Sequence, residues 1–298
     1  MKEIVSMLLA LLCLYANTQA QGRRPAKLQL DSLYINEIEE KNEPAKILHA
    51  EPLYIDLIRD LGARKGEKEW NFGFGLTDRL KHDRYSALVE YEFAPINRLG
   101  LEVEVPVTFY VPLKNEPWDS VPSARVEALK MAAQYTLLVA ERAKTSLAIG
   151  YINELQIADI RSFDIKKPIQ GNVFNPFIIV AKRWGNNFHT LLYTGPHISM
   201  PFYEHGVHTV WQINTNIHYM IRGTRNFIGL ELNKEAWKNE FNITIRPQLR
   251  VSITDNILIG LVTGIPVNRA NERFSMFTRL IYEPGHKSGR RKLKHITN

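Results

Sequence analysis

The chain has 298 residues, of which 45% are hydrophobic and 23% are charged, and its formal net charge is +7. This length allows one large barrel or two ordinary domains, and the apolar content suffices for either. The charge does not indicate a nucleic-acid-binding protein, because five of the basic residues lie in one short C-terminal segment: Lys287, Arg290, Arg291, Lys292 and Lys294.

Residues 1–20 have the layout of a secretion signal. An apolar run follows Lys2, and a short polar stretch ends at Ala20, where we expect cleavage. Acylation of Cys13 in a lipoprotein signal is the alternative, disfavoured because Leu12 is not small. Since Cys13 is the only cysteine, the exported chain would form no disulfide. The mature protein is therefore expected to reside in the cell envelope and to contain no disulfide bonds.

Residues 21–68 are predicted to be a periplasmic N-terminal segment with an amphipathic helix over residues 51–61. Pro52 suits the first turn of a helix and Gly62 its end. A helix this short is marginal alone and must dock. We expect it to plug the periplasmic mouth of a barrel, with docking outside the barrel or on a partner as alternatives. Its predicted apolar face comprises Leu53, Leu57, Ile58 and Leu61.

A metal site in this segment is not expected. His49 precedes the predicted helix, while Glu51 and Asp56 are five positions apart and point in different directions on it. Helix capping and packing of the plug explain these residues better. We predict no metal and no cofactor.

Residues 69–283 alternate between apolar and polar side chains, which predicts β-strands with one apolar face. The clearest case, Val207 to Arg222, is longer than ordinary globular strands. No stretch after the signal has the roughly 18 apolar residues of a transmembrane helix. About twelve strands are predicted: Trp70 to Thr77, Tyr85 to Ala94, Leu99 to Tyr110, Arg125 to Val139, Thr145 to Gln156, Val173 to Arg183, Phe188 to Ser199, Val207 to Arg222, Arg225 to Leu232, Glu240 to Val251, Ile257 to Ile265 and Arg273 to Tyr282.

The fold class this pattern predicts is all-β: an antiparallel transmembrane β-barrel of about 12 strands with a short N-terminal helix. Short turns, such as those near Pro95 and Gly185, alternate with longer connections, as in outer-membrane barrels. Pro247 predicts a bulge or a break in strand pairing. A secreted two-sheet sandwich is the alternative, and it would bury the apolar face. The barrel places both termini, including a basic tail at residues 284–298, in the periplasm of a Gram-negative cell.

The inward face of the predicted barrel is polar and carries charges of both signs. Carboxylates gather on neighbouring strands, and arginines gather near the strand that closes the barrel. Opposed rows of charge would orient polar solutes in a pore, whereas direct pairing would fill a narrow interior. The predicted lumen-lining residues are Glu90, Glu92, Glu102, Glu104, Gln212, Asn214, Asn216, His218, Arg246, Arg250, Arg273 and Arg279.

The stretch from His49 to Asp56 reads HAEPLYID and resembles the eponymous motif of the HAEPLYID family of Gram-negative bacteria. The resemblance extends through Leu57 to Gly66. It implies an outer-membrane barrel and no known activity. The pieces Gly100 to Pro106 and Gly260 to Pro266 are similar to hairpins of transporter-like outer-membrane barrels.

Three functions are compatible with this architecture. The leading hypothesis is a passive, porin-like channel or transporter for small polar solutes, and the alternative is a non-conducting envelope anchor or assembly protein. A phospholipase-like hydrolase would use His197 and Ser199 with Asn214 or Asn216, but those side chains are predicted to face inward rather than toward lipid. The expected partners are outer-membrane lipid, the outer-membrane assembly machinery and a small polar solute.

Overall fold

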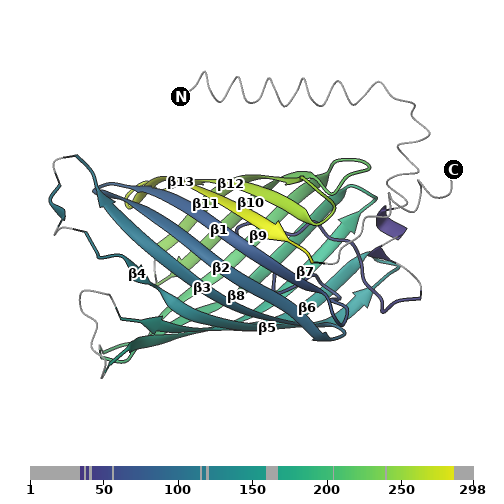
Figure 1. Cartoon of the computed structure of the whole chain (residues 1–298), viewed down its shortest axis with the longest axis horizontal. Coiled ribbons are helices and arrows are strands. Elements are labelled where there is room, and N and C mark those ends of the chain that lie inside the picture. Colours follow the sequence, from purple (N-terminus) through teal and green to yellow (C-terminus); the bar gives the residue numbers. More distant parts are fainter. Residues whose placement is uncertain are drawn as a thin grey trace, which may run out of the picture.

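The computed structural model is a closed antiparallel β-barrel of 12 strands (Figure 1). A further two-residue strand, β4, pairs with β3 just before β5 begins, and β1 pairs with β13 to close the wall. The strands are β1 (Lys68–Arg79), β2 (His82–Ile96), β3 (Leu99–Pro112), β4 (Arg125–Val126), β5 (Ala128–Ala140), β6 (Thr145–Ile157), β7 (Ile169–Trp184), β8 (Phe188–Pro201), β9 (His208–Met220), β10 (Phe227–Trp237), β11 (Glu240–Ser252), β12 (Ile257–Pro266) and β13 (Glu272–Tyr282).

The structure describes residues 34–36, 38–39, 42–55, 57–114, 116–118, 121–158, 167–203, 205–238 and 240–284. The predicted signal peptide at 1–20, the tail from residue 285 onward and Asp56 lie outside the described residues. None of the helices in the described ranges is long and apolar enough to cross a bilayer.

The strands present an apolar row outward and a polar row inward over much of the wall. In β9, Trp211 and Ile217 are about half exposed, whereas Asn214 and His218 are buried. A sandwich would bury the apolar row instead. The sandwich alternative is therefore wrong, and the alternation predicted for Val207 to Arg222 is confirmed as a barrel strand.

The two ends of the barrel differ in their connections. One end, called the short-turn end below, has turns at residues 97–98, 141–144, 185–187, 221–226 and 253–256. At the opposite end, the long-loop end, the connections at 113–124, 158–168 and 202–207 are longer, but those at 80–81 and 238–239 have only two residues. The predicted asymmetry is thus present but partial.

The expected interruption at Pro247 is present. Pairing between β11 and β12 passes from Ile245 opposite Ile265 to Gln248 opposite Val262, and it omits Arg246 and Pro247. Proline has no N–H to donate to the neighbouring strand.

Residues 51–61 do not form the predicted helix, and this is the main correction to the sequence analysis. The described part of this segment consists of bends and irregular backbone, while the short helix of the N-terminal region lies at residues 34–36. The chain around residues 45–66, called the plug below, runs inside the barrel near the short-turn end (Figure 1). Several of its backbone amides donate hydrogen bonds to side chains of the wall. These bonds replace the backbone hydrogen bonds that a helix would form.

Two hydrophobic clusters join the plug to opposite parts of the wall. Leu57, Ile58 and Leu61 pack with residues of β5 to β8, including Ala132, Phe177 and Ile179. Leu48, Ala50 and Leu53 pack with residues of β9, β10, β12 and β13. The spacing of Leu53, Leu57, Ile58 and Leu61 therefore predicted burial correctly, but these side chains point to different walls and not to one helix face.

Candidate functional site: the plugged lumen

The backbone of the plug is held by side chains of the barrel wall. Leu53 N–H donates to Gln248 of β11 at 2.8 Å, and Gly62 N–H donates to Thr136 of β5 at 2.8 Å. Because an unpaired buried amide is costly, these acceptors make an irregular segment stable inside the barrel. Three more plug amides donate in the same way: Ala50 to His189, Ile55 to Glu231 and Arg59 to Glu92.

Arg59 is the main charged contact between the plug and the wall. Its Nη1 donates to Glu69 of β1 at 2.7 Å and lies 3.7 Å from Glu92 of β2. Its backbone N–H also donates to Glu92, at 2.7 Å. Arg59 adopts a φ of 64°, which is unusual for a residue with a side chain. Burial lowers the pKa of Arg59, but Glu69, Asp60 and Glu92 raise it well above its ordinary value. The guanidinium is therefore a fixed cation against the acidic wall.

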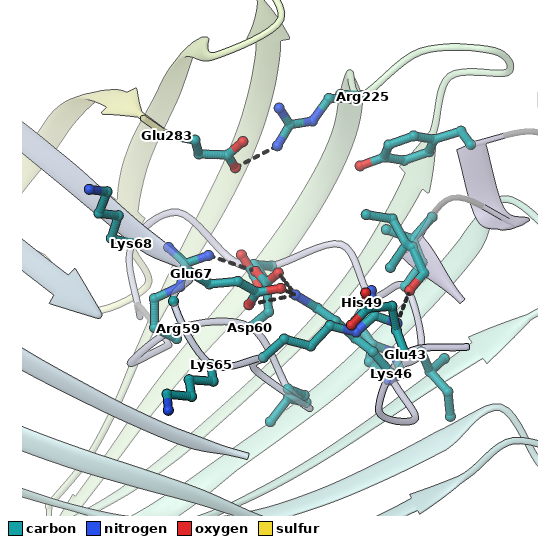
Figure 2. A pocket seen from close by; sticks show the side chains of 18 of the residues that line it. Glu43, Lys46, His49, Arg59, Asp60, Lys65, Glu67, Lys68, Arg225 and Glu283 are labelled. Carbon is teal, nitrogen blue, oxygen red and sulfur yellow. Dashed lines mark hydrogen bonds and ion pairs between the residues drawn. The ribbon is translucent and has the colours of Figure 1, made fainter. Parts of the chain in front are cut away.

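A second ion-pair group lies at the short-turn end, between two plug residues and Glu67, which directly follows the plug. Figure 2 shows Lys46 between Asp60 and Glu67, with the Lys46 Nζ to Glu67 Oε1 distance at 2.8 Å. Burial lowers the pKa of Lys46, but the two carboxylates raise it above its ordinary value. Burial raises the pKa of Asp60, but Lys46 and Arg59 lower it well below the usual range. These pairs join the two ends of the plug to each other.

Two wall glycines allow the plug to approach closely. A Cβ on Gly100 of β3 would lie 2.0 Å from the carbonyl oxygen of Ile58, and one on Gly260 of β12 would lie 2.6 Å from a methyl carbon of Leu53. Any larger residue at these positions would collide with the plug. The wall is thus shaped to the plug backbone on two sides.

His49 is buried in a mostly cationic and neutral environment. Its Nε2 lies 2.9 Å from Ser146 Oγ of β6. Burial, together with the charge of Arg183, lowers the pKa of His49 from 6.5 to about 3, and Asp60 opposes this shift. His189 of β8, which accepts from the neighbouring Ala50 amide, also lies close. The imidazole of His49 is therefore uncharged in the docked plug at neutral pH.

Tyr54 is a partly exposed residue of the plug that contacts the inner wall of the barrel. It is 40% exposed, and the Arg246 guanidinium of β11 lies 3.4 Å from its ring centre. The Tyr54 ring also meets the edge of Phe277 of β13, with centres 6.2 Å apart. Tyr54 thus contacts the middle of β11 and β13 while part of its surface stays open.

Two cavities lie on either side of this plug. The larger, of about 540 Å³, is at the short-turn end and is lined by charged residues that include Lys46, Arg59, Arg250 and Glu283 (Figure 2). The smaller, of about 300 Å³, is at the long-loop end and is lined by Gln156, Gln170, Ser199, Pro201, Tyr203 and His208. Polar space therefore exists on both sides of the closure.

Ten of the twelve residues predicted to line the lumen are buried on its inner face. Gln212 is partly buried, and Arg273 is exposed at the long-loop end, where it pairs with Asp78 at 2.6 Å. The expected separation of charge across the lumen is wrong for Arg279, because β13 adjoins β1 and Arg279 lies 3.4 Å from Glu90. The buried ten are Glu90, Glu92, Glu102, Glu104, Asn214, Asn216, His218, Arg246, Arg250 and Arg279.

Several residues of the site were not singled out in the sequence. Gln134, Thr136, His189, Glu231 and Gln248 bind the plug backbone or lie beside it. Their inward parity was readable from the strand pattern, but nothing in that pattern says which polar residues meet the plug. Phe177 and Ile179 face inward although they are apolar, because the plug covers them.

Lipid-facing apolar strands, a closed wall and a polar interior define an outer-membrane-type β-barrel. The chain belongs to the HAEPLYID-like family, whose model matches residues 45–283. The match begins at the plug, so the plug and the barrel belong to one family unit. No curated protein matches the chain.

Solved structures of outer-membrane barrels resemble this fold. The COG4313 outer membrane channel from Pseudomonas putida F1 has a TM-score of 0.57 and 11% identity, over 75% of this chain and 98% of that chain. The KdgM porin has a TM-score of 0.49 and 14% identity, over 72% of this chain and 98% of that chain. At these identities the likeness concerns the fold alone.

Proposed function

We propose that this protein is an outer-membrane channel for small polar solutes that is closed at rest by its own plug. In the closed state, residues 45–66 fill the barrel at the short-turn end. The channel opens when this segment leaves or rearranges. The short-turn end and both termini face the periplasm in this proposal, and the long-loop end faces the exterior.

The observation that carries the proposal is the nature of the groups that hold the plug. Glu92, Thr136 and Gln248 are wall side chains whose polar atoms are satisfied by plug amides. Without the plug, these groups would need water or a polar solute as partners. A barrel closed only by its own side chains would pair them with one another. Here a separable segment of the chain fills the space.

The cavity at the long-loop end is evidence that the solute is polar and largely uncharged. Its described lining offers two amides, a hydroxyl, a phenol and an imidazole from Gln156, Gln170, Ser199, Tyr203 and His208. Such groups donate and accept hydrogen bonds without selecting a charge. An entering solute would next meet Tyr54 and Arg246 at the surface of the plug.

A reversible lock tests this proposal. A Cβ at Gly260 would lie 3.2 Å from Leu53 Cγ, which is one bond from Leu53 Cβ. The two positions are therefore close enough to try a disulfide, which needs Cβ atoms about 3.5 to 4.5 Å apart. Leu53→Cys with Gly260→Cys fixes the plug without a bulky side chain at the point of contact. The exported chain contains no other cysteine if cleavage occurs after Ala20.

The measurement is single-channel conductance in planar bilayers, with swelling of solute-loaded liposomes as a second readout. We expect the oxidised double variant to show no conductance and the reduced double variant to conduct. The conductance of Leu53→Cys alone should not change on oxidation or reduction. Equal conductance before and after reduction would contradict the proposal. A wild-type protein and plug-loosened variants that are all silent would support the alternative, a non-conducting anchor or assembly protein.

A hydrolytic function has less support. His197 and Ser199 lie on inward-facing positions of β8, away from lipid. Within the described ranges, Ser199 makes no side-chain hydrogen bond to a histidine, which a serine nucleophile requires for activation. We therefore do not propose this activity.

A further inference from the structure

The cavity at the short-turn end contains a buried arginine without a paired carboxylate. Arg250 of β11 lines this cavity of about 540 Å³ and is 7% exposed. Its Nε lies 3.4 Å from the Arg225 carbonyl oxygen, and its guanidinium carbon lies 4.6 Å from the Phe227 ring centre. Within the described part of the chain, its two terminal nitrogens make no hydrogen bond, and no carboxylate lies within 4 Å of them. A buried charge without a partner is strongly unfavourable.

Most carboxylates that line this cavity are already paired with other cations. They are Asp60 and Glu67, which both pair with Lys46, and Glu283, which pairs with Arg225 at 2.5 Å. These carboxylates are therefore not available to compensate Arg250.

Glu51 is the remaining carboxyl group that acts on Arg250, and it is bonded elsewhere. Burial and the adjacent Asp60 raise the pKa of Glu51 well above its ordinary value, although Arg250 opposes this shift. The neutral carboxyl of Glu51 donates a hydrogen bond to Asp60. A neutral carboxyl supplies no negative charge, so the guanidinium of Arg250 remains uncompensated.

The lining as a whole carries more positive than negative charge. Figure 2 shows Lys65 and Lys68 beside the cavity, and both side chains are exposed. Among the described residues of the lining, the cations with no carboxylate within 4 Å are Arg64, Lys65, Lys68 and Arg250, and the carboxyl groups with no such cation are Glu43 and Glu51. A concave surface with an excess of positive charge attracts anions.

We propose that this cavity binds a small anion that carries carboxylate or phosphate groups, with Arg250 as its main contact. The two terminal nitrogens of an arginine match two oxygens of such a group, and this contact is strong when both partners are charged. The cavity volume of about 540 Å³ is within the usual range of ligand pockets. Lys46 and Asp60 of the plug face the cavity from one side, and Lys68 and Arg250 of the wall face it from the other. The anion therefore lies between the plug and the wall.

A bound anion should favour the docked plug, because the cavity is enclosed only while the plug is in place. A ligand that binds one state alone multiplies the population of that state by one plus the ratio of ligand concentration to Kd. At about ten times Kd, open probability should fall about elevenfold. This consequence rests on the proposed function, whereas anion binding does not. Binding with no change in open probability would support the site and contradict gating by the plug.

The test is isothermal titration of the full-length mature protein in detergent at constant ionic strength, with sodium phosphate and sodium citrate as separate probes. We expect one anion per chain, and the tighter probe identifies the preferred group. Arg250→Gln should weaken binding by about tenfold or more. The matched control is Arg222→Gln, which removes an exposed arginine at the same end of the barrel that does not line the cavity. The control should bind both probes as tightly as the wild type.

Two further variants keep the proposal testable if Arg250→Gln does not fold. Arg250→Lys retains the charge but loses the paired terminal donors, so it should bind more weakly than the wild type. Lys68→Gln changes an exposed side chain of the lining and should weaken binding by a smaller factor. The proposal is overturned if the wild type binds neither probe at millimolar concentrations. It is also overturned if the variants at Arg250 and Lys68 all bind as tightly as Arg222→Gln.

Discussion

The plug is held by charge on one side of the barrel and by apolar packing on the other. The wall formed by β1 to β3 offers Glu69 and Glu92 to Arg59. The wall formed by β5 to β8 offers Ala132, Phe177 and Ile179 to Leu57, Ile58 and Leu61. The acidic side depends on one cation, whereas the apolar side divides its stabilisation among several side chains.

This difference indicates which contact controls the release of the plug from the wall. Loss of the Arg59 charge leaves the buried carboxylates of Glu69 and Glu92 without the cation that pairs with both, so we expect the acidic contact to fail abruptly. Loss of one methyl group on the apolar side only reduces buried area and leaves a cavity. We therefore expect opening to start at the acidic wall, and the following predictions compare the two sides.

The largest effect is expected for Arg59→Met. It removes the cation that binds Glu69 and Glu92, and the docked plug should lose about 4 kcal/mol relative to the released plug. Single-channel recording should show a rise in open probability of more than a hundredfold. Lys65→Met is the control, because the Lys65 side chain is exposed. An unchanged open probability in Arg59→Met would mean that the acidic wall does not hold the plug.

Leu61→Ala tests the apolar side. Leu61 is 1% exposed within the cluster against β5 to β8, so its truncation should destabilise the docked plug by about 3 kcal/mol. Open probability should rise, but less than in Arg59→Met. Ile178→Ala is the control, because Ile178 lies on β7 but faces outward. Equal effects of Leu61→Ala and Ile178→Ala would show that the apolar wall does not contact the plug in the membrane.

Acid should weaken docking through His49. Its pKa is about 3 in the docked plug and 6.5 ordinarily, so the released plug binds the proton more tightly. Docking is then lost as pH falls below 6.5, by about 1.4 kcal/mol per pH unit, or about 2 kcal/mol at pH 5. Conductance of wild type should rise on acidification more steeply than that of His49→Gln.

The comparison with His49→Gln separates His49 from its neighbours. Burial raises the pKa of Glu51, and this acts in the opposite direction because the docked state gains a proton on acidification. Glu51, Asp60, Arg183 and His189 remain in both proteins, so the difference between the two pH curves belongs to His49. Parallel curves would exclude His49 as the source of acid sensitivity.

The smallest effect is expected for Arg273→Ala. Arg273 was predicted to line the lumen, but it forms an exposed ion pair with Asp78 at the long-loop end, far from the plug contacts. Such pairs contribute less than about 1 kcal/mol. Thermal unfolding and open probability should both stay near wild type. A large change in open probability would place a second gate at the long-loop end.

The sequence predicted the barrel but not the conformation of the plug. Strand alternation depends on local geometry and is visible in β9 and β11 without any partner. The conformation of the plug lacks that independence, because its amides donate to Gln248, Glu231 and Glu92 from three different strands. Its leucine spacing suited a helix, but tertiary hydrogen bonds overrode that preference. The alternation along each strand predicted which side chains face inward. It could not predict their partners, because these depend on where the plug lies.

The central claim is that departure of the plug opens the channel. Leu53→Cys tests it most directly, since Leu53 is 2% exposed when docked. The rate at which a membrane-impermeant reagent modifies the introduced thiol is measured in the same bilayers as open probability, for the Leu53→Cys protein alone and with Arg59→Met or Leu61→Ala. We predict that the modification rate rises in proportion to the open fraction. Channels that open while the introduced thiol stays protected, or rapid modification of silent channels, would contradict the account.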